Sequence, residues 1–486
     1  MNITTYKNYI DGKWQDSVSG KIFPDINPAN QKQIIGYFQK SNVEDVRKAI
    51  ESANRAFGIW SKWSPSKRAN VLSQAVSLLK EQQNKLAEYL TLEEGKTLKE
   101  SEAEIKSAIK EMEFQIAQGQ RLFGKNSFPE NGKSFSYTIR QPLGVVSILS
   151  PWNFPVNVPC RKITPALMAG NTVIFKPASF TPLCGLKFVE ILNKAGIPDG
   201  VLNFITGSGS TIGDEMVANQ FIKAVSFTGS NEIGSRINRI ASKNMARVQL
   251  EMGGKNPTVV LEDADLELAA SGVFLAAYSC SGQWCTSTSR VILDKKIANN
   301  FIKILIKKAR KIRVGDGLNK DTSMGPLAGE SQLNRVLEYI ELGKKEGARL
   351  IFGGKRLKGA QYDRGFFVEP TIFTDVKRNM RIAQEEIFGP VLSIIEADNF
   401  SEALSIANGI QYGLSSSIYT KDIFSAMEFI KKTEVGLTHV NLPTSFKEPQ
   451  LPFGGIKSSG YGLPEAGDTG IEFFTENKSV YINYKK

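Results

Sequence analysis

The stretch SGQWCTSTSR, residues 281–290, places Cys285 among small hydroxyl side chains. A cysteine thiolate is a strong nucleophile, whereas many buried cysteines are inert apolar fillers. Both interpretations are open for Cys285 taken alone. Gly282 and the hydroxyl residues after the cysteine suggest a tight turn into a regular element, and a helix start there would lower the thiol pKa. The other cysteines lie in apolar or helical contexts and are predicted to be structural: Cys160, Cys184 and Cys280.

The usual partner of a nucleophilic cysteine is histidine, and this chain has only one. That residue, His439, lies in GLTHVNLP and is predicted to be a packed or surface side chain. A carboxylate offers another base. Glu251 ends the strand-like run of LEMGGK, where a glycine pair follows and permits close backbone approach. Glu251 is therefore either a general base or an ordinary turn carboxylate.

Asn153 lies in SPWNFP, between two prolines that stiffen the loop. A rigidly held amide can donate a hydrogen bond to an oxyanion, which typically contributes about 3 kcal/mol to catalysis. The alternative is an asparagine that simply forms a turn. Two glycine-rich stretches, TGSGSTIG (206–213) and FTGSNEIG (227–234), are each predicted to follow a strand and open a helix. Such turns either cradle phosphate groups with backbone N–H groups or serve as plain loops.

The length and composition of the chain predict its number of domains and its class of protein. A chain of 486 residues is expected to form about two or three domains. Hydrophobic residues make up 41% and charged residues 23%, which is typical of soluble globular proteins. No apolar run is long enough to span a bilayer, and the N-terminus lacks the apolar core of a signal peptide. We therefore expect a cytoplasmic protein that makes no membrane contact.

The charge and the cysteine count exclude several further classes. Four scattered cysteines and one histidine predict neither a disulfide framework nor a metal site. The net charge is +12, but the basic residues alternate with acids along the chain instead of forming a stripe. This distribution argues against nucleic-acid binding, although the positive field favours anionic substrates and cofactor phosphates.

The hydrophobic pattern predicts the elements that must position these residues. Residues 43–120 are predicted to be helical, and from residue 143 short apolar runs ending at Gly or Pro alternate with helical stretches. This alternation predicts a parallel α/β sheet, and a second alternation from about 258 to 440 predicts a second one. Two outlying segments, 134–142 and 479–484, alternate like exposed strands. They either pair with another subunit or are covered within the monomer.

Seven short motifs follow one another along the chain: PWNFP, KPAS, FTGSNEIG, LEMGGKNP, GQWC, EEIFGPV and PFGGIKSSG. Together, in this order, they resemble the aldehyde dehydrogenase superfamily over essentially the whole chain. The glutamate-to-cysteine separation of 34 residues (285 − 251) also agrees with that family. Within it, the sequence most resembles the α-ketoglutarate semialdehyde (2,5-dioxopentanoate) dehydrogenases.

By this resemblance Cys285 is the nucleophile that attacks an aldehyde to give a thiohemiacetal. Asn153 and the Cys285 backbone N–H would hold the oxyanion, a hydride would pass to a nicotinamide, and Glu251 would activate the water that hydrolyses the thioester. The resemblance also implies a cofactor site for NADP or NAD. Its residues would be Trp152, Lys176, Ser179, Gly209, Gly229, Ser230, Glu386 and Phe388.

Two positions bear on specificity. Family members that prefer NAD often carry Glu three residues after the KPAS lysine, where this chain has Ser179, so we predict that NADP is accepted. Arg161 falls where succinate semialdehyde dehydrogenases carry a substrate-binding arginine. It would either grip a distal carboxylate or form an ion pair between elements. Arg290 is predicted to be structural.

The family implies an α/β fold with a Rossmann-type cofactor domain (1–124, 145–251 and 449–469), an α/β catalytic domain (252–448) and a small β oligomerisation arm (125–144 and 470–486). A homodimer or homotetramer is expected. The predicted activity is NAD(P)-dependent oxidation of a carboxylate-bearing semialdehyde, such as α-ketoglutarate semialdehyde. The alternatives are a broad-specificity aldehyde or succinate semialdehyde dehydrogenase, a cysteine acyl transferase such as a coenzyme A-acylating relative, and a non-catalytic structural protein.

Overall fold

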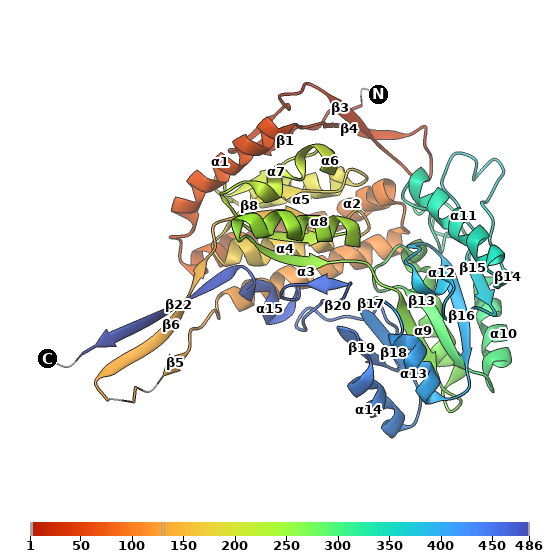
Figure 1. The fold of residues 1–486 in the computed structure, drawn as a ribbon. Helices are drawn as coiled ribbons and strands as arrows, with labels where there is room; N and C mark the ends of the chain where they lie inside the picture. Colours follow the sequence, from red (N-terminus) through yellow and green to blue (C-terminus); the bar gives the residue numbers. More distant parts are fainter. Residues whose placement is uncertain (1–2, 128, 131, 485–486) are drawn as a thin grey trace.

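The structure, a computed structural model, describes residues 3–127, 129–130 and 132–484. Positions 1, 2, 128, 131, 485 and 486 of the predicted cofactor domain and arm lie outside the described residues. The chain forms two α/β units side by side and a long two-stranded ribbon that projects away from them (Figure 1). These units and the ribbon carry the α/β fold that the sequence predicts.

Three long helices follow the N-terminal strands, as the apolar spacing of residues 43–120 predicts. Local sequence fixes their limits: Asn42 and Thr97 each form a capping box, and Gly95 ends the middle helix with a positive φ of 99°. The strands are β1 (Asn8–Ile10), β2 (Lys13–Gln15), β3 (Ile22–Ile26) and β4 (Ile34–Gln39), and the helices are α1 (Val43–Trp60), α2 (Pro65–Glu94) and α3 (Leu98–Gly119).

The first sheet has a parallel core in the order β9-β8-β7-β10-β11. Its strands are β7 (Val145–Leu149), β8 (Thr172–Lys176), β9 (Leu202–Phe204), β10 (Ile222–Thr228) and β11 (Arg247–Glu251). The chain runs outward from β7 to β9 and then returns to β10 on the other side, which creates a switch point between β7 and β10. Ligands of open α/β sheets bind outside the strand carboxyl ends at such a point.

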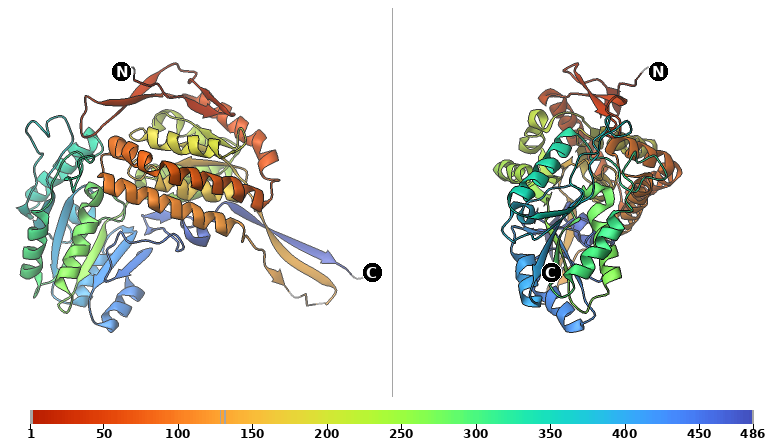
Figure 2. Two further views of the ribbon diagram at one scale, coloured as in Figure 1. Left: turned by 180° about the vertical axis from the view of Figure 1, so that it is seen from behind. Right: turned by 90° about the vertical axis from the view of Figure 1, so that its right-hand side faces the viewer.

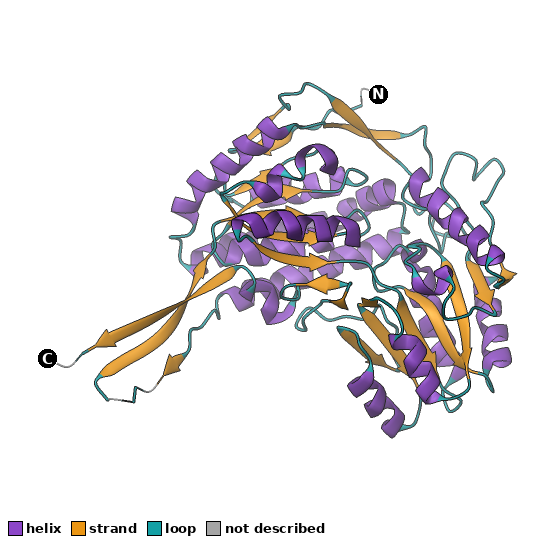
Figure 3. Cartoon of the chain, in the orientation of Figure 1, coloured by secondary structure: helices purple, strands orange, loops and turns teal. Residues whose placement is uncertain are grey.

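Helices cover both faces of this first sheet (Figure 3). Besides α1, α2 and α3, the helices of this unit are α4 (Asn157–Met168), α5 (Pro182–Lys194), α6 (Gly209–Ile212), α7 (Glu215–Ala218), α8 (Asn231–Ala241) and α15 (Gly467–Glu472). β1 and β2 extend one edge antiparallel, and β21 (Gly460–Tyr461), from near the C-terminus, pairs antiparallel with β11 at the other. The C-terminal part of the chain thus returns to the edge strand that ends at Glu251.

The second sheet has the order β14-β15-β16-β13-β12-β18-β19, and only its edge strand β14 is antiparallel. Its strands are β12 (Asn256–Val260), β13 (Thr288–Asp294), β14 (Arg349–Phe352), β15 (Thr371–Thr374), β16 (Val391–Ala397), β18 (Ser415–Tyr419) and β19 (Leu437–Val440). Its helices are α9 (Leu266–Tyr278), α10 (Ala298–Ala309), α11 (Glu330–Lys345), α12 (Arg381–Gln384), α13 (Phe400–Asn408) and α14 (Ile423–Lys432). A small pair, β17 (Tyr412–Gly413) and β20 (Ile456–Lys457), lies beside it.

The two outlying segments pair with each other. β6 (Ser134–Pro142) and β22 (Thr475–Asn483) run antiparallel over their full length, and β5 (Asn126–Ser127) extends the pair. The left view of Figure 2 shows this ribbon projecting away from the two sheets. Since it leaves strand edges unpaired, it provides a surface on which another chain could form hydrogen bonds. Within the part of the chain that the structure describes, every helix is too short or too polar to span a bilayer.

Candidate active site

A cavity of about 250 Å³ lies where the two sheets face each other. Its walls come from the carboxyl ends of β7, β10 and β11 and from the turn before β13. Many of the predicted site residues line it: Trp152, Asn153, Arg161, Gly229, Ser230, Glu251, Cys285, Glu386 and Phe388. Of the described residues predicted to bind the cofactor, Lys176, Ser179 and Gly209 lie outside this lining.

Cys285 lies in a turn between the short 3₁₀ helix η2 (Ser279–Gly282) and β13. The element after the turn is a strand, so the helix start considered for this position is wrong and no helix N-terminus favours the thiolate. Burial raises the pKa of Cys285 to about 12, while the positive charges of Lys447 and Arg161 act in the opposite direction. The side-chain amide of Asn256 donates to the Cys285 carbonyl oxygen at 2.7 Å and fixes the turn.

The segment just before this turn is strained. Cys280 and Ser281 both adopt left-handed backbone conformations, with φ of 51° and 56°, which cost about 1–3 kcal/mol each outside glycine. Two hydrogen bonds hold them there: Glu100 accepts from the Cys280 backbone N–H at 2.7 Å, and the Ser281 hydroxyl donates to the Gly325 carbonyl at 2.8 Å. The cysteine turn is therefore held in place by α3 and by the loop before α11.

Asn153 follows β7 and is held from both sides. The Lys96 ammonium donates to the Asn153 carbonyl oxygen at 2.6 Å, and the Asn153 side-chain amide donates to the Gln283 carbonyl oxygen at 3.0 Å. Gln283 in turn accepts from the Ala328 backbone N–H at 2.9 Å. The amide of Asn153 is thus fixed two residues away from Cys285, across the boundary between the two sheets.

Glu251 is the last residue of β11, and its side chain is buried. Burial is the main cause that raises its pKa well above the ordinary range, and repulsion from Glu465 adds to this, while Lys162 and Arg161 oppose it. Among the described residues, Glu251 Oε2 has no hydrogen-bond partner. A Cβ at Gly454 would lie 2.9 Å from Glu251 Oε1, so glycine is required beside this carboxyl. Such a carboxyl is a strong base with an oxygen available to a water molecule.

Arg161 lies at the wall of the same cavity but is heavily engaged. It is 3% exposed, and its guanidinium binds Glu111 at 3.0 Å and lies 3.7 Å from Glu465. It also donates to Asn157 Oδ1 at 3.0 Å and lies 4.7 Å from the centre of the Phe453 ring. These contacts match the alternative of an ion pair between elements.

The residues proposed for the adenosine end lie at neighbouring strand ends. Lys176 is the last residue of β8; its ammonium donates only to the Pro177 carbonyl among the described residues, and burial lowers its pKa to about 8. Ser179 is exposed and donates to the Gly207 carbonyl at 3.3 Å. Gly209 opens α6 in the adjacent loop. The Lys176 ammonium has N–H groups that are not used within the described residues, and the Ser179 hydroxyl is exposed. Both could donate hydrogen bonds to a phosphorylated ribose.

The pyrophosphate and nicotinamide parts of a bound dinucleotide would lie nearer the cavity than its adenosine end. Ser230 caps α8, and Gly229 precedes it at the carboxyl end of β10, so both lie at the positive end of a helix of 11 residues. Glu386 accepts from the Gly254 backbone N–H at 3.0 Å. The Trp152 ring meets Phe388 edge-on at 5.4 Å between centroids. This set of donors and aromatic walls at the switch point fits a dinucleotide.

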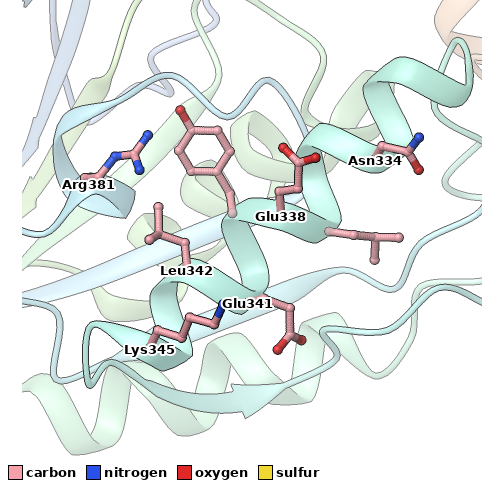
Figure 4. A pocket seen from close by; sticks show the side chains of 8 residues that line it. Asn334, Glu338, Glu341, Leu342, Lys345 and Arg381 are labelled. Carbon is pink, nitrogen blue, oxygen red and sulfur yellow. The ribbon is translucent and has the colours of Figure 1, made fainter.

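A separate hollow lies over α11 (Figure 4). It is lined by α11 side chains such as Glu338, Glu341 and Lys345 and by Arg381 of α12, which pairs with Glu385 at 2.8 Å. It contains no nucleophile beside a base, so we place the reaction in the cavity around Cys285. No group of three or more potential metal ligands occurs among the described residues.

The remaining sequence expectations concern structural residues. His439 is buried, with both ring nitrogens 2.9 Å from backbone carbonyls, and is a packed side chain as predicted. Arg290 is fully buried and donates to three backbone carbonyls, which confirms its structural role. The other cysteines, Cys160, Cys184 and Cys280, are buried as expected.

Sequence reasoning missed several residues of the site. Lys447 lines the cavity, Lys96 and Gln283 hold the Asn153 loop, and Glu465 lies beside Glu251. Each comes from a segment distant in sequence from the residue that it contacts, and only Gln283 belongs to one of the quoted motifs, GQWC. Only the glycine-rich context of PFGGIKSSG pointed to a close backbone approach in this part of the chain.

Known proteins similar to this chain agree on the family. The family model described as Aldehyde dehydrogenase family matches residues 14–480. The alpha-ketoglutaric semialdehyde dehydrogenase of Bacillus subtilis is 42% identical over 98% of this chain and 98% of its own length. The 2,5-dioxopentanoate dehydrogenase of Saccharolobus solfataricus is also 42% identical, over 98% of this chain and 99% of its own length.

Solved structures agree on the fold. Betaine aldehyde dehydrogenase from Staphylococcus aureus in complex with NAD+ has a TM-score of 0.96 and 34% identity, covering 99% of this chain and 95% of that one. A 3,6-anhydro-L-galactose dehydrogenase in complex with NADP has a TM-score of 0.96 and 36% identity, covering 99% of this chain and 100% of that one. The likeness thus extends through both sheets and the ribbon.

Proposed function

The chain belongs to the aldehyde dehydrogenase family, and we propose that it oxidises a semialdehyde bearing a carboxylate, such as α-ketoglutarate semialdehyde. NAD(P)-dependent oxidation of aldehydes is the activity of this family. The observation that carries the assignment of the site is that Cys285, Glu251 and Asn153 line one cavity. The substrate class is supported by relatives named for this semialdehyde and by the cation Lys447 in the cavity wall.

In the first half-reaction the thiol of Cys285 gives its proton to solvent, and the thiolate adds to the aldehyde carbon and forms a thiohemiacetal. The side-chain amide of Asn153 and the backbone N–H of Cys285 stabilise the oxyanion. A nicotinamide cofactor held by Glu386, Phe388 and Trp152 would supply the acceptor for the hydride that leaves the former aldehyde carbon. Cys285 then carries the acyl group as a thioester.

In the second half-reaction Glu251 removes a proton from water, which attacks the thioester carbon and releases the acid and the thiol. The raised pKa of Glu251 makes its carboxylate a stronger base, and its unpartnered Oε2 is the oxygen that receives the proton. Since the base is a carboxylate, histidine is not needed for this step.

We propose that NADP is accepted and that Ser179 permits it. A hydroxyl at this position donates to a 2′-phosphate, whereas a carboxylate would repel it. Lys176, whose ammonium has donors to spare among the described residues, would bind the adenosine ribose. Gly209, Gly229 and Ser230 would contact the phosphates, and Glu386, Phe388 and Trp152 would hold the nicotinamide half.

The domain organisation remains a prediction: cofactor domain 1–124, 145–251 and 449–469, catalytic domain 252–448, and arm 125–144 and 470–486. We propose that the ribbon of β6 and β22 mediates a homodimer or homotetramer and that the protein is cytoplasmic. Size-exclusion chromatography with light scattering would measure the oligomeric state.

The experiment that tests the function is a panel of aldehydes against NAD and NADP with the purified protein. We expect the carboxylate-bearing semialdehydes to give the highest kcat/KM. Adding coenzyme A tests the acyl-transfer alternative. An acyl transferase would release a coenzyme A thioester, whereas the proposed dehydrogenase would still release the free acid. Absence of cofactor reduction with every aldehyde would favour the non-catalytic alternative.

A further inference from the structure

Lys447 occupies a position that the sequence did not single out. It follows β19 in the loop SFKEP and lines two cavities: the one that contains Cys285 and a larger one of about 960 Å³. Phe154, Asn157 and Trp284 also line both. The second cavity extends toward α3 and the loop after α10, away from Glu386 and the cofactor residues. A substrate that enters from this side passes Lys447 before it reaches the nucleophile.

The ammonium of Lys447 has donors to spare. It carries three N–H groups, and one donates to Asn157 Oδ1 at 3.0 Å. Among the described residues no carboxylate lies within 4.0 Å of it. Arg161, in contrast, is neutralised by Glu111 and Glu465. A third cation of the cavity wall, Arg335, donates to the Glu386 backbone carbonyl at 2.6 Å on the cofactor side. Lys447 is thus the cation that lines both cavities and has no carboxylate within 4.0 Å among the described residues.

The surroundings of Lys447 strengthen its attraction for an anion. The rings of Phe154 and Phe453 each lie 5.9 Å from its nitrogen, and the side chain is partly buried. Charges interact more strongly in such an environment than in water. Burial, together with repulsion from Arg161, lowers the pKa of Lys447 to about 8, although Glu111, Cys285 and Glu104 act in the opposite direction. A bound carboxylate would supply the missing charge.

We propose that Lys447, and not Arg161, binds the distal carboxylate of the substrate while the aldehyde carbon lies at Cys285. This inference rests on the proposed function and names the residue that selects its substrate class. Arg161 then holds the carboxyls of Glu111 and Glu465 and orients Asn157, which accepts from both cations.

The test compares α-ketoglutarate semialdehyde with pentanal, an uncharged aldehyde of the same chain length. For Lys447→Met we expect the ratio of kcat/KM for the two substrates to fall at least about 10-fold, mainly through KM of the semialdehyde. Lys447→Arg, which keeps the charge, should restore most of the ratio. The control is Lys421→Met, which removes the same charge from an exposed position before α14 and should leave the ratio within about 2-fold.

A binding readout supports the kinetic one. Glutarate should inhibit pentanal oxidation by the wild-type enzyme and do so at least about 10-fold more weakly in Lys447→Met. With the wild-type enzyme the substrate ratio should also fall above about pH 8, as the ammonium loses its proton. The charged groups that act on it are Arg161 of α4, Glu104 and Glu111 of α3, and Cys285.

The outcomes separate the two proposals. If the wild-type enzyme prefers the semialdehyde strongly and Lys447→Met keeps that preference, the role of Lys447 is overturned and the proposed function stands. A wild-type enzyme without any preference for the semialdehyde overturns the proposed substrate class, and the inference with it. An equal loss of kcat/KM for both aldehydes in Lys447→Met would indicate that Lys447 acts on the thiol of Cys285 and not on the distal carboxylate. This outcome would also overturn the inference.

Discussion

The side-chain amide of Asn153 donates to the carbonyl oxygen of Gln283 at 3.0 Å, two residues before Cys285. One residue follows β7 of the first sheet and the other precedes β13 of the second. The proposed oxyanion donor and the proposed nucleophile are therefore held together by a bond that crosses the boundary between the two sheets. Rigidity here matters because a donor fixed in advance stabilises developing charge without reorganisation.

Replacing Asn153 with Ala should lower kcat by about 10²- to 10³-fold with a smaller change in KM, because the lost hydrogen bond forms in the transition state. Steady-state kinetics with a saturating cofactor would measure this. The control is Asn299→Ala on the exposed face of α10, which should behave like the wild type. A loss confined to KM would contradict the oxyanion role of Asn153.

Replacing Glu251 with Gln should block the hydrolysis of the thioester, since an amide cannot take the proton from water. We expect a rapid burst of reduced cofactor followed by very slow turnover, and an acyl group retained on Cys285. Stopped-flow absorbance and intact-protein mass spectrometry would detect the burst and the acyl enzyme. If the burst itself disappears, Glu251 acts on the thiol instead of on water.

The thiol of Cys285 should be protonated at neutral pH in the cofactor-free enzyme. Burial destabilises the thiolate and raises its pKa to about 12, so the thiolate fraction grows with pH throughout the neutral and mildly alkaline range. The rate of alkylation by iodoacetamide should rise about tenfold per pH unit from pH 7 to about pH 10. An exposed thiol would instead level off above its pKa of about 8.5.

The alkylation assay has a clear control in Cys285→Ala. The remaining cysteines of this variant are all buried and should be labelled far more slowly. A plateau in the wild-type rate below about pH 9 would show that the thiol is not destabilised by burial in solution.

Ser179→Glu should shift cofactor preference toward NAD by about 10-fold or more, since a carboxylate accepts from the 2′-hydroxyl and repels the 2′-phosphate. The ratio of kcat/KM for NADP and NAD measures this shift. Ser179→Ala removes the hydroxyl without adding charge and should weaken NADP use only modestly. A wild-type enzyme with a strong preference for NAD would contradict the role given to Ser179.

The family followed from the sequence alone, and so did the residues that we propose to react. The helices over residues 43–120, the parallel strands and the glycine-rich turns were predicted correctly because local apolar spacing and turn residues determine them. Arg290 and His439 were also assigned to structural roles correctly. The motifs around Cys285, Glu251 and Asn153 identified the chemistry because each keeps its residue types and order within a short stretch.

The tertiary structure decided what surrounds those residues. A strand follows Cys285 where a helix was considered, and burial among side chains from distant segments raises the pKa of the thiol to about 12. Arg161 forms ion pairs with two carboxylates, whereas Lys447 keeps N–H groups that no carboxylate accepts from among the described residues. These contacts join α3, α4 and two C-terminal loops. Charge balance in a buried site depends on distances between segments that are far apart in sequence, and local pattern carries no information about those distances.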